Sequence, residues 1–199
     1  MPVDEAGQDE AFLAFRTKLI EAAERKDDKY IISVLDPKIE LSFGGQSGIA
    51  DFKKMWKIGQ KDSPFWEEFL AVIKNGGSFT GDGMAKLDHF AAPYTFSAWP
   101  EDVDGFEYLA VFGSNVNLRE SPSAEANVVD RLSYNMVKPE GEWLGKSRTD
   151  GPGQWRKVIT MGGKSGYIHS DYLRSHIDYR AGFAKKRGVW KMAYFISGD

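Results

Sequence analysis

The sequence contains no cysteine among its 199 residues. A chain without thiols cannot form disulfides, hold a thiolate zinc site or use a cysteine nucleophile. Because cysteine-free chains suit oxidising and reducing compartments equally well, this absence excludes chemistry and leaves the location open.

The chain also has little excess of either positive or negative charge. The 26 Lys and Arg residues against 29 Asp and Glu give a formal net charge of −3, and no block of five or six like charges occurs. Proteins that bind nucleic acid neutralise its phosphates with clustered Lys and Arg. The sequence therefore predicts no nucleic-acid partner.

Long hydrophobic runs are missing as well, since no apolar run approaches the roughly 18 residues of a membrane-spanning helix. The start, residues 1–5, lacks the basic and apolar regions of a signal peptide. We therefore expect no membrane span and a protein that is soluble as given. A polar start also remains when an export signal or lipid anchor is removed, and the protein is then periplasmic or otherwise extracytoplasmic.

Two Gly-Lys-Ser triplets, at Gly145 and Gly163, match the end of a phosphate-binding loop. That loop needs a further glycine five positions earlier, which lets the backbone wrap the phosphates, and the sequence has Glu140 and Val158 there. Neither triplet is followed by a helical pattern. The sequence thus predicts that no nucleotide binds.

Histidine is rare, and His89, His169 and His176 show no metal-ligand spacing. Residues 102–105 hold only a fragment of a calcium loop, which needs more oxygen ligands. We therefore expect neither a metal nor any other cofactor.

The first hundred residues have an α+β pattern. Apolar residues at helical spacing predict a first helix along Phe12, Phe15, Leu19 and Ala23. The further predicted elements are a short helix at 30–35, a strand at 38–43, a helix around 52–56 and a helix at 64–75, which Ser63 caps and two glycines end. Aromatic residues in these helices predict a substantial core or a lined pocket, of which the core is the simpler interpretation.

An acidic, proline-led stretch at 100–105 is interpreted as a linker, and short strands separated by turn residues follow it. They are predicted at 108–112, 116–119, 128–132, 155–160 and 165–168, which indicates a small barrel or sandwich. A last hairpin is predicted from 179–183 and 189–196, and we interpret the charges of its basic turn, 185–188, as a solvated tip.

The strand-rich region closely resembles the bacterial SH3-like (SH3b) domain. The resemblance rests on VNLRESPS at 116–123, VVDRL at 128–132, WRKV at 155–158 and GYIHSDYL at 166–173, in order over about 108–174. It implies a small β-barrel in which residues 162–166 form the turn before the last strand. The segment 139–154 is longer than this family usually needs.

The flanking regions resemble, more weakly, a cystatin-like or nuclear-transport-factor-like α+β cone. The residues involved are 26–28, 35–45 and the apolar tail 188–199. We therefore predict a discontinuous α+β domain, 1–104 with 175–199, completed by the C-terminal β-hairpin, and an SH3-like barrel at 105–174. A tail packed only on the barrel would contradict this prediction.

The SH3-like resemblance implies a non-enzymatic binding or docking module of the bacterial cell envelope, with peptidoglycan or a protein or peptide as ligand. Aromatic residues are the expected lining of its groove, although Trp155 has a structural role as an equal alternative. The predicted ligand-binding residues are Tyr134, Trp143, Trp155 and Tyr172.

Two other functions stay open at this point. One is a cell-envelope hydrolase with a carboxylate- or serine-based site in the first domain, and the other is a structural or assembly component. The hydrolase candidates are Asp36, Asp51, Asp82, Asp88 and Ser47. The simpler interpretation of each aspartate is a cap, a turn or a surface charge, and that of Ser47 is the N-cap of the helix that follows.

Overall fold

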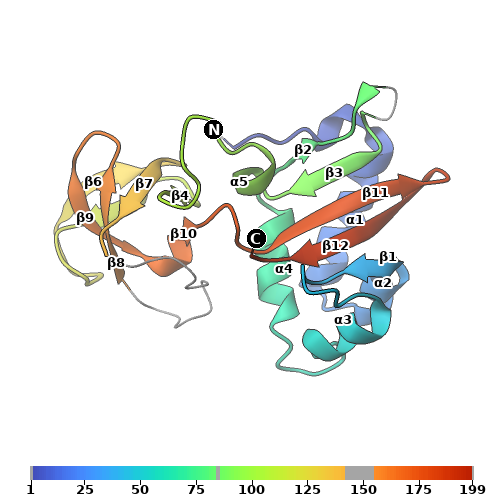
Figure 1. Ribbon diagram of the computed structural model, residues 1–199. Helices are drawn as coiled ribbons and strands as arrows, with labels where there is room; N and C mark the ends of the chain where they lie inside the picture. Colours follow the sequence, from blue (N-terminus) through green and yellow to red (C-terminus); the bar gives the residue numbers. More distant parts are fainter. Residues whose placement is uncertain (1, 84–85, 142–154, 199) are drawn as a thin grey trace. The chain divides into compact units, whose positions relative to one another are not determined.

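The computed structural model describes residues 2–83, 86–141 and 155–198 (Figure 1). Contacts divide the chain into two compact units. One, the split unit, consists of Pro2–Ala98 and Tyr179–Asp199, and the other, the inserted unit, consists of Trp99–Asp178. By these contacts the inserted unit begins at residue 99 and ends at residue 178, whereas the sequence predicted a barrel at 105–174. Helices and two open sheets make the fold mixed α+β.

The split unit is built on a five-stranded sheet in the order β1-β12-β11-β3-β2. Its strands are β1 (Leu35–Glu40), β2 (Ser78–Phe79), β3 (His89–Ala92), β11 (Arg180–Lys186) and β12 (Val189–Ile196). All neighbours are antiparallel except β1 and β12, which are parallel. The last hairpin therefore lies inside this sheet and pairs on both sides with strands from the first hundred residues.

Four helices of the split unit form close to where the apolar period predicts them, namely α1 (Glu10–Glu24), α2 (Asp28–Ser33), α3 (Ile49–Met55) and α4 (Phe65–Ile73). Two short helices, η1 (Ala6–Gln8) and α5 (Tyr94–Ser97), were not predicted. Asp9 caps α1, because its carboxylate accepts the Phe12 N–H at 2.8 Å. Pro64, rather than the predicted Ser63, occupies the N-cap position of α4, and Ser63 Oγ accepts the Phe65 N–H at 3.4 Å.

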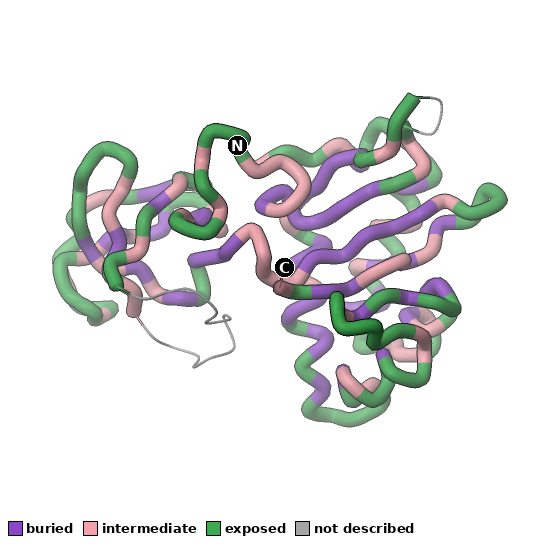
Figure 2. The backbone as a smooth tube through the Cα atoms, viewed as in Figure 1, coloured by how far each residue is buried: buried purple, intermediate pink, exposed green. Residues whose placement is uncertain are grey.

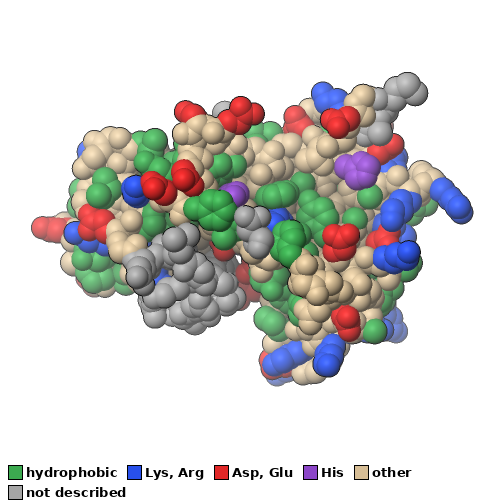
Figure 3. All heavy atoms as spheres, viewed as in Figure 1, with side chains coloured by type: hydrophobic (Ala, Val, Ile, Leu, Met, Phe, Trp, Pro, Cys, Tyr) green, Lys and Arg blue, Asp and Glu red, His purple; other side chains and the backbone are tan. Residues whose placement is uncertain are grey.

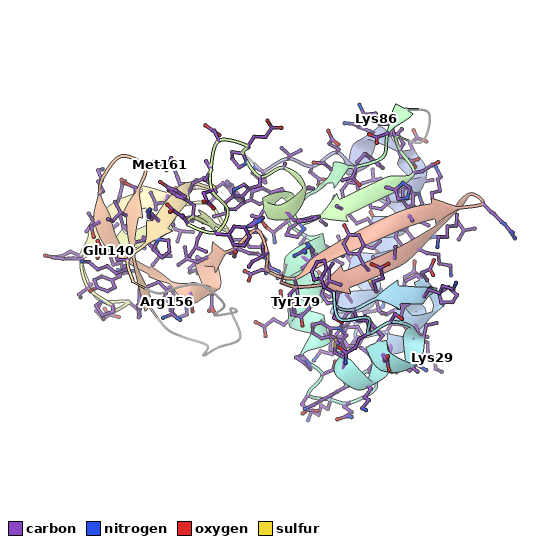
Figure 4. All side chains as sticks on the ribbon, in the orientation of Figure 1. Lys29, Lys86, Glu140, Arg156, Met161 and Tyr179 are labelled. Carbon is purple, nitrogen blue, oxygen red and sulfur yellow. The ribbon has the colours of Figure 1, made fainter. Side chains whose placement is uncertain are left out.

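The core of the split unit is aromatic. Phe12 of α1 is fully buried, and its ring centroid lies 4.2 Å from that of Phe90 and 4.7 Å from that of Trp190. Tyr179, labelled in Figure 4, lies where the chain re-enters this unit, with its ring 4.9 Å from Trp56. Figure 2 shows the resulting run of buried residues along β3, β11 and β12.

The first strand differs from its prediction. It covers Leu35–Glu40 rather than 38–43, so Leu35 belongs to a strand instead of a helix, and Phe43 is exposed. Alternation of apolar and polar residues favoured a strand at 38–43. The pairing of Leu35 with Met192 of β12 decides which residues form the strand. Ser47 is also not a cap: Gly48 occupies the N-cap position of α3, with φ 90° and no side-chain cap.

The basic turn between β11 and β12 is more than a solvated tip. Arg187 and Gly188 have φ values of 51° and 79°, as a two-residue hairpin turn requires. Lys185, however, pairs with Asp9 at 2.7 Å, and Lys186 pairs with the buried carboxylate of Asp36 at 2.5 Å. The hairpin therefore ties its basic end to α1 and β1, and Figure 3 shows Lys and Arg gathered there.

The pairing of Asp36 with Lys186 predicts an acid-sensitive contribution to stability. The hydrogen bond from Lys186 is the main cause that lowers the pKa of Asp36 below its usual 3.8. A carboxyl with a lowered folded-state pKa stabilises the fold above 3.8, and this contribution is lost as the pH falls through the folded value. Since the Lys186 side chain is 63% exposed, solvent screening keeps the contribution near 1 kcal/mol.

We expect Asp36→Asn to lower the free energy of unfolding by about 1 kcal/mol near neutral pH and by clearly less well below pH 3.8. Urea denaturation of both proteins across this range measures the difference. A difference that does not change with pH would contradict the assignment. Asp51→Asn, at an exposed position of α3, is the matched control.

The inserted unit is a seven-stranded sheet in the order β10-β4-β7-β8-β9-β5-β6, with antiparallel neighbours throughout. Its elements are β4 (Leu109–Val111), β5 (Val116–Arg119), β6 (Val128–Leu132), β7 (Met136–Pro139), β8 (Trp155–Thr160), β9 (Ser165–His169), η3 (Ser170–Tyr172) and β10 (Leu173–Arg174). Five of the strands lie where the sequence predicts them, while β7 and β10 are additional.

Small apolar residues fill the core of the inserted unit, among them Leu118, Val158 and Ile168, which are fully buried. Gly166 lies against this core, where a Cβ atom would be 2.7 Å from Leu118 Cγ and 2.8 Å from the Arg119 carbonyl oxygen. Glycine at position 166 therefore permits a close approach that a side chain would block. Residues 161–164 form the turn between β8 and β9, so Gly163 belongs to a hairpin turn.

Candidate ligand-binding pocket

The inserted unit has a pocket of about 430 Å³. We call it the Trp155 pocket. It is lined by Ser114, Asn115, Val116, Asn117, Arg119, Ala124, Trp155, His169, Asp171 and Tyr172. Its volume is in the range of sites that bind small molecules.

Three adjacent strands, β8, β9 and β5, supply the floor of this pocket. Side chains alternate between the two faces of a strand, so residues that flank a buried position point away from the core. Ile168 is buried, which turns His169 to the outer face, and burial of Leu118 does the same for Asn117 and Arg119. The pleat thus gathers polar side chains that are far apart in the sequence.

Strand register places Trp155 directly opposite His169. Their rings meet edge to face, with centroids 5.4 Å apart and an interplanar angle of 88°. Trp155 is half-buried, so part of its ring remains available to a ligand. The proposed structural role and a binding role for this residue are therefore compatible.

The one-turn helix η3 supplies the rim. His169 caps it, and the Nδ1 atom of His169 lies 3.2 Å from Asp171 Oδ2. The carbonyl oxygen of Tyr172 accepts the Phe112 N–H at 2.8 Å, which fixes the helix to the sheet. The Tyr172 side chain itself is 47% exposed. An aromatic ring is thereby held at the pocket mouth by a rigid backbone.

Charges of both signs lie in this pocket. Arg119 donates one guanidinium hydrogen bond to the Ala126 carbonyl oxygen at 2.7 Å, and Asp171 contributes a carboxylate. Asn115 and Asn117 add amide donors and acceptors. This set can hydrogen-bond a ligand that carries amides, a carboxylate and an amino group, and the two aromatic rings can cover its apolar parts.

Of the four residues predicted to bind ligand, the structure brings two together, because Trp155 and Tyr172 both line the pocket. Tyr134 does not line it and lies in the turn before β7 with φ 57°. Trp143 lies outside the described residues. Arg119, His169 and Asp171 were not predicted, and only the strand alternation around the GYIHSDYL motif carried a signal for His169.

The residues proposed for a hydrolase do not form a recognisable site in the described ranges. Ser47 pairs with Glu40 in an isolated bridge, and Asp36 is held by Lys186. Ser114 Oγ lies 3.3 Å from Ser133 Oγ, and no hydrogen bond joins it to His169 in the described part of the chain. Residues 2–83, 86–141 and 155–198 contain no group of three or more His, Asp or Glu side chains placed to hold a metal.

Comparisons with known proteins give no match among family models, curated proteins or solved structures. Within the described part of the chain, no helix has the length and apolar character needed to cross a bilayer. The function is therefore argued from the geometry of the Trp155 pocket and from the sequence motifs around it.

Proposed function

We propose that this protein is a non-enzymatic binding protein of the bacterial cell envelope, outside the cytoplasm, and that its inserted unit is a bacterial SH3-like barrel. The Trp155 pocket binds peptidoglycan through its peptide portion, or a related peptide. The observation that carries the proposal is the meeting of Trp155 and Tyr172 with Arg119 and Asp171 in one pocket.

Peptide chemistry suits this pocket. A peptide presents N–H donors and C=O acceptors along its backbone, and short wall peptides also carry free carboxylates and amino groups. Arg119 and Asp171 can pair with such end groups, while Asn115 and Asn117 can bond the amides. The VNLRESPS and GYIHSDYL motifs that resemble the SH3-like family supply Arg119, His169, Asp171 and Tyr172 of this pocket.

The split unit is proposed to be a cystatin-like or nuclear-transport-factor-like α+β domain. Its last hairpin provides the inner strands β11 and β12, and helices α1 and α4 contribute buried aromatic residues to the core on the sheet. This arrangement is the one expected for such a cone. The binding role proposed for the Trp155 pocket does not depend on it.

We expect Tyr172→Ala to weaken retention of the full chain on insoluble peptidoglycan by about tenfold, because the variant loses the aromatic ring that the ligand is proposed to cover at the pocket mouth. Co-sedimentation over a range of peptidoglycan concentrations measures it. The Tyr172 side chain is about half exposed, so the variant should fold, which circular dichroism checks.

Tyr134→Ala is the matched control, because it removes a tyrosine of the same unit that does not line the pocket. It should bind like the wild type. Failure of the folded wild type to sediment with peptidoglycan would refute the proposed ligand. Equal losses in both variants would refute the assignment of binding to the Trp155 pocket.

A further inference from the structure

A second pocket lies in the split unit, and its lining comes from α1, α2 and the start of β12. We call it the Lys18 pocket, and its volume is about 450 Å³. It is lined by Ala11, Ala14, Phe15, Lys18, Tyr30, Ser33, Val34, Gly188, Val189, Trp190 and Lys191. None of these residues belongs to the Trp155 pocket, so the two sites are independent.

The floor of the Lys18 pocket is apolar. Phe15, Val34 and Trp190 are half-buried or buried, and they are joined by the small side chains of Ala11 and Ala14. At the rim, Val189 leaves 56% of its surface exposed. Covering such a surface with an apolar group removes it from water, which is favourable in proportion to the area covered.

Every charged residue that lines this pocket is a lysine. Lys191 donates from Nζ to the Ser33 carbonyl oxygen at 2.6 Å. Lys18 is exposed, and its ammonium has no ion pair or hydrogen bond among the described residues. Two acidic residues near the hairpin are paired with other lysines, Asp9 with Lys185 and Asp36 with Lys186. The lining residues thus include two ammonium groups and no carboxylate.

Two further polar groups of the pocket lack partners in the described part of the chain. Trp190 is only 4% exposed, and its Nε1 donor is buried without a hydrogen-bond acceptor. The Tyr30 hydroxyl makes no hydrogen bond there either, and burial raises its pKa. The Lys185 ammonium lies 5.5 Å from the Trp190 ring centroid and is paired with Asp9.

We propose that the Lys18 pocket binds a small amphipathic anion, a carboxylic acid whose apolar body is a short acyl chain or a single ring. The carboxylate pairs with Lys18, within reach of the cationic rim that Lys191 extends. The apolar body covers Phe15, Val34 and the exposed side chain of Val189. Charge complementarity and an apolar floor together favour this class over a neutral lipid or a cationic ligand.

The test is a titration of the ¹⁵N-labelled full chain with sodium octanoate, followed through the indole N–H resonance of Trp190. That resonance is expected to shift and to saturate, while the indole signal of Trp155 stays unchanged. 1-Octanol has the same chain without the carboxylate, and it is expected to bind at least tenfold more weakly because it cannot pair with Lys18.

Lys18→Glu is expected to weaken octanoate binding by about tenfold, since it replaces a charge-assisted contact with repulsion. Lys54→Glu makes the same charge change at an exposed position of α3 that does not line the pocket, and it should bind octanoate like the wild type. Both substitutions are on the surface and should leave the fold intact.

Four results would overturn the proposal. Octanol binding as tightly as octanoate would remove the role of charge, and equal effects of the two lysine variants would remove the role of this pocket. A Trp190 resonance that does not move in the folded wild type would show that no such anion binds. A dimer that octanoate does not dissociate and that Val189→Ser abolishes would instead assign this surface to a second copy of the chain.

Discussion

Replacing Phe12 by alanine is expected to lower the free energy of unfolding of the split unit by about 3–5 kcal/mol. Phe12 is 0% exposed, and its ring lies within 6.1 Å, centroid to centroid, of the rings of Phe15, Phe79, Phe90, Phe183 and Trp190. These rings belong to α1 and to four strands of the sheet. Because the surrounding elements cannot all collapse onto the vacated volume, the loss includes a cavity as well as the transfer of the ring.

Urea denaturation monitored by far-UV circular dichroism measures this loss, and hydrogen exchange locates it. Exchange should accelerate in α1 and in β11 and β12, and it should change little in β4 to β7 of the inserted unit. Leu13→Ala, one residue along α1 and 41% exposed, is the control and should cost well under half as much. A Phe12 variant as stable as the Leu13 variant would contradict the central place assigned to Phe12.

Gly77→Ala is expected to destabilise the split unit by about 3 kcal/mol. A Cβ atom at this position would lie 2.2 Å from the carbonyl oxygen of Ala91 and 2.6 Å from the Phe90 ring. The φ value of 153° is also one that residues other than glycine rarely adopt. Since the closest atom belongs to backbone held in the β2–β3 ladder, the clash cannot be relieved by rotating a side chain.

Gly77 also ties down the N-terminal segment. Its N–H donates to the Val3 carbonyl oxygen, and its own carbonyl oxygen accepts the Glu5 N–H, each at 2.9 Å. Hydrogen exchange at Glu5 should therefore accelerate in the variant. Gly7→Ala is the control, because a Cβ atom there meets nothing within 4 Å, and its effect should stay within about 0.5 kcal/mol. Equal stability of the two variants in urea would show that the chain moves to accommodate the added methyl group without strain.

The two binding pockets differ in how far the sequence could predict them. Trp155 and Tyr172 were predicted because aromatic residues accompany the SH3-like motifs, and both lie in the Trp155 pocket. His169 and Arg119 were missed, since their place on the outer face follows from pairings such as Trp155 with His169 and Arg119 with Tyr167. The Lys18 pocket was not predicted at all, because its lining comes from residues 11–34 and 188–191.

The strands show the same division. The hairpin β11–β12 was predicted, because its two runs are apolar and a basic turn with glycine joins them. Strands β2, β3, β7 and β10 were not predicted, and β2 and β10 have only two residues each, too few for alternation to show. The register of β1 was mispredicted because a parallel partner more than 150 residues away sets it.

By itself, the sequence determined that thiol chemistry is excluded, that the fold is mixed α+β and where the longer helices lie. Composition excludes thiol chemistry directly, and helices such as α1 and α4 depend on contacts between residues three or four positions apart. Only the tertiary structure decided strand register, the partners of charges such as Lys186 with Asp36, and the two pockets. The physical reason is distance along the chain. These contacts form between segments that meet only when each sheet has formed, and no local pattern encodes which segments meet.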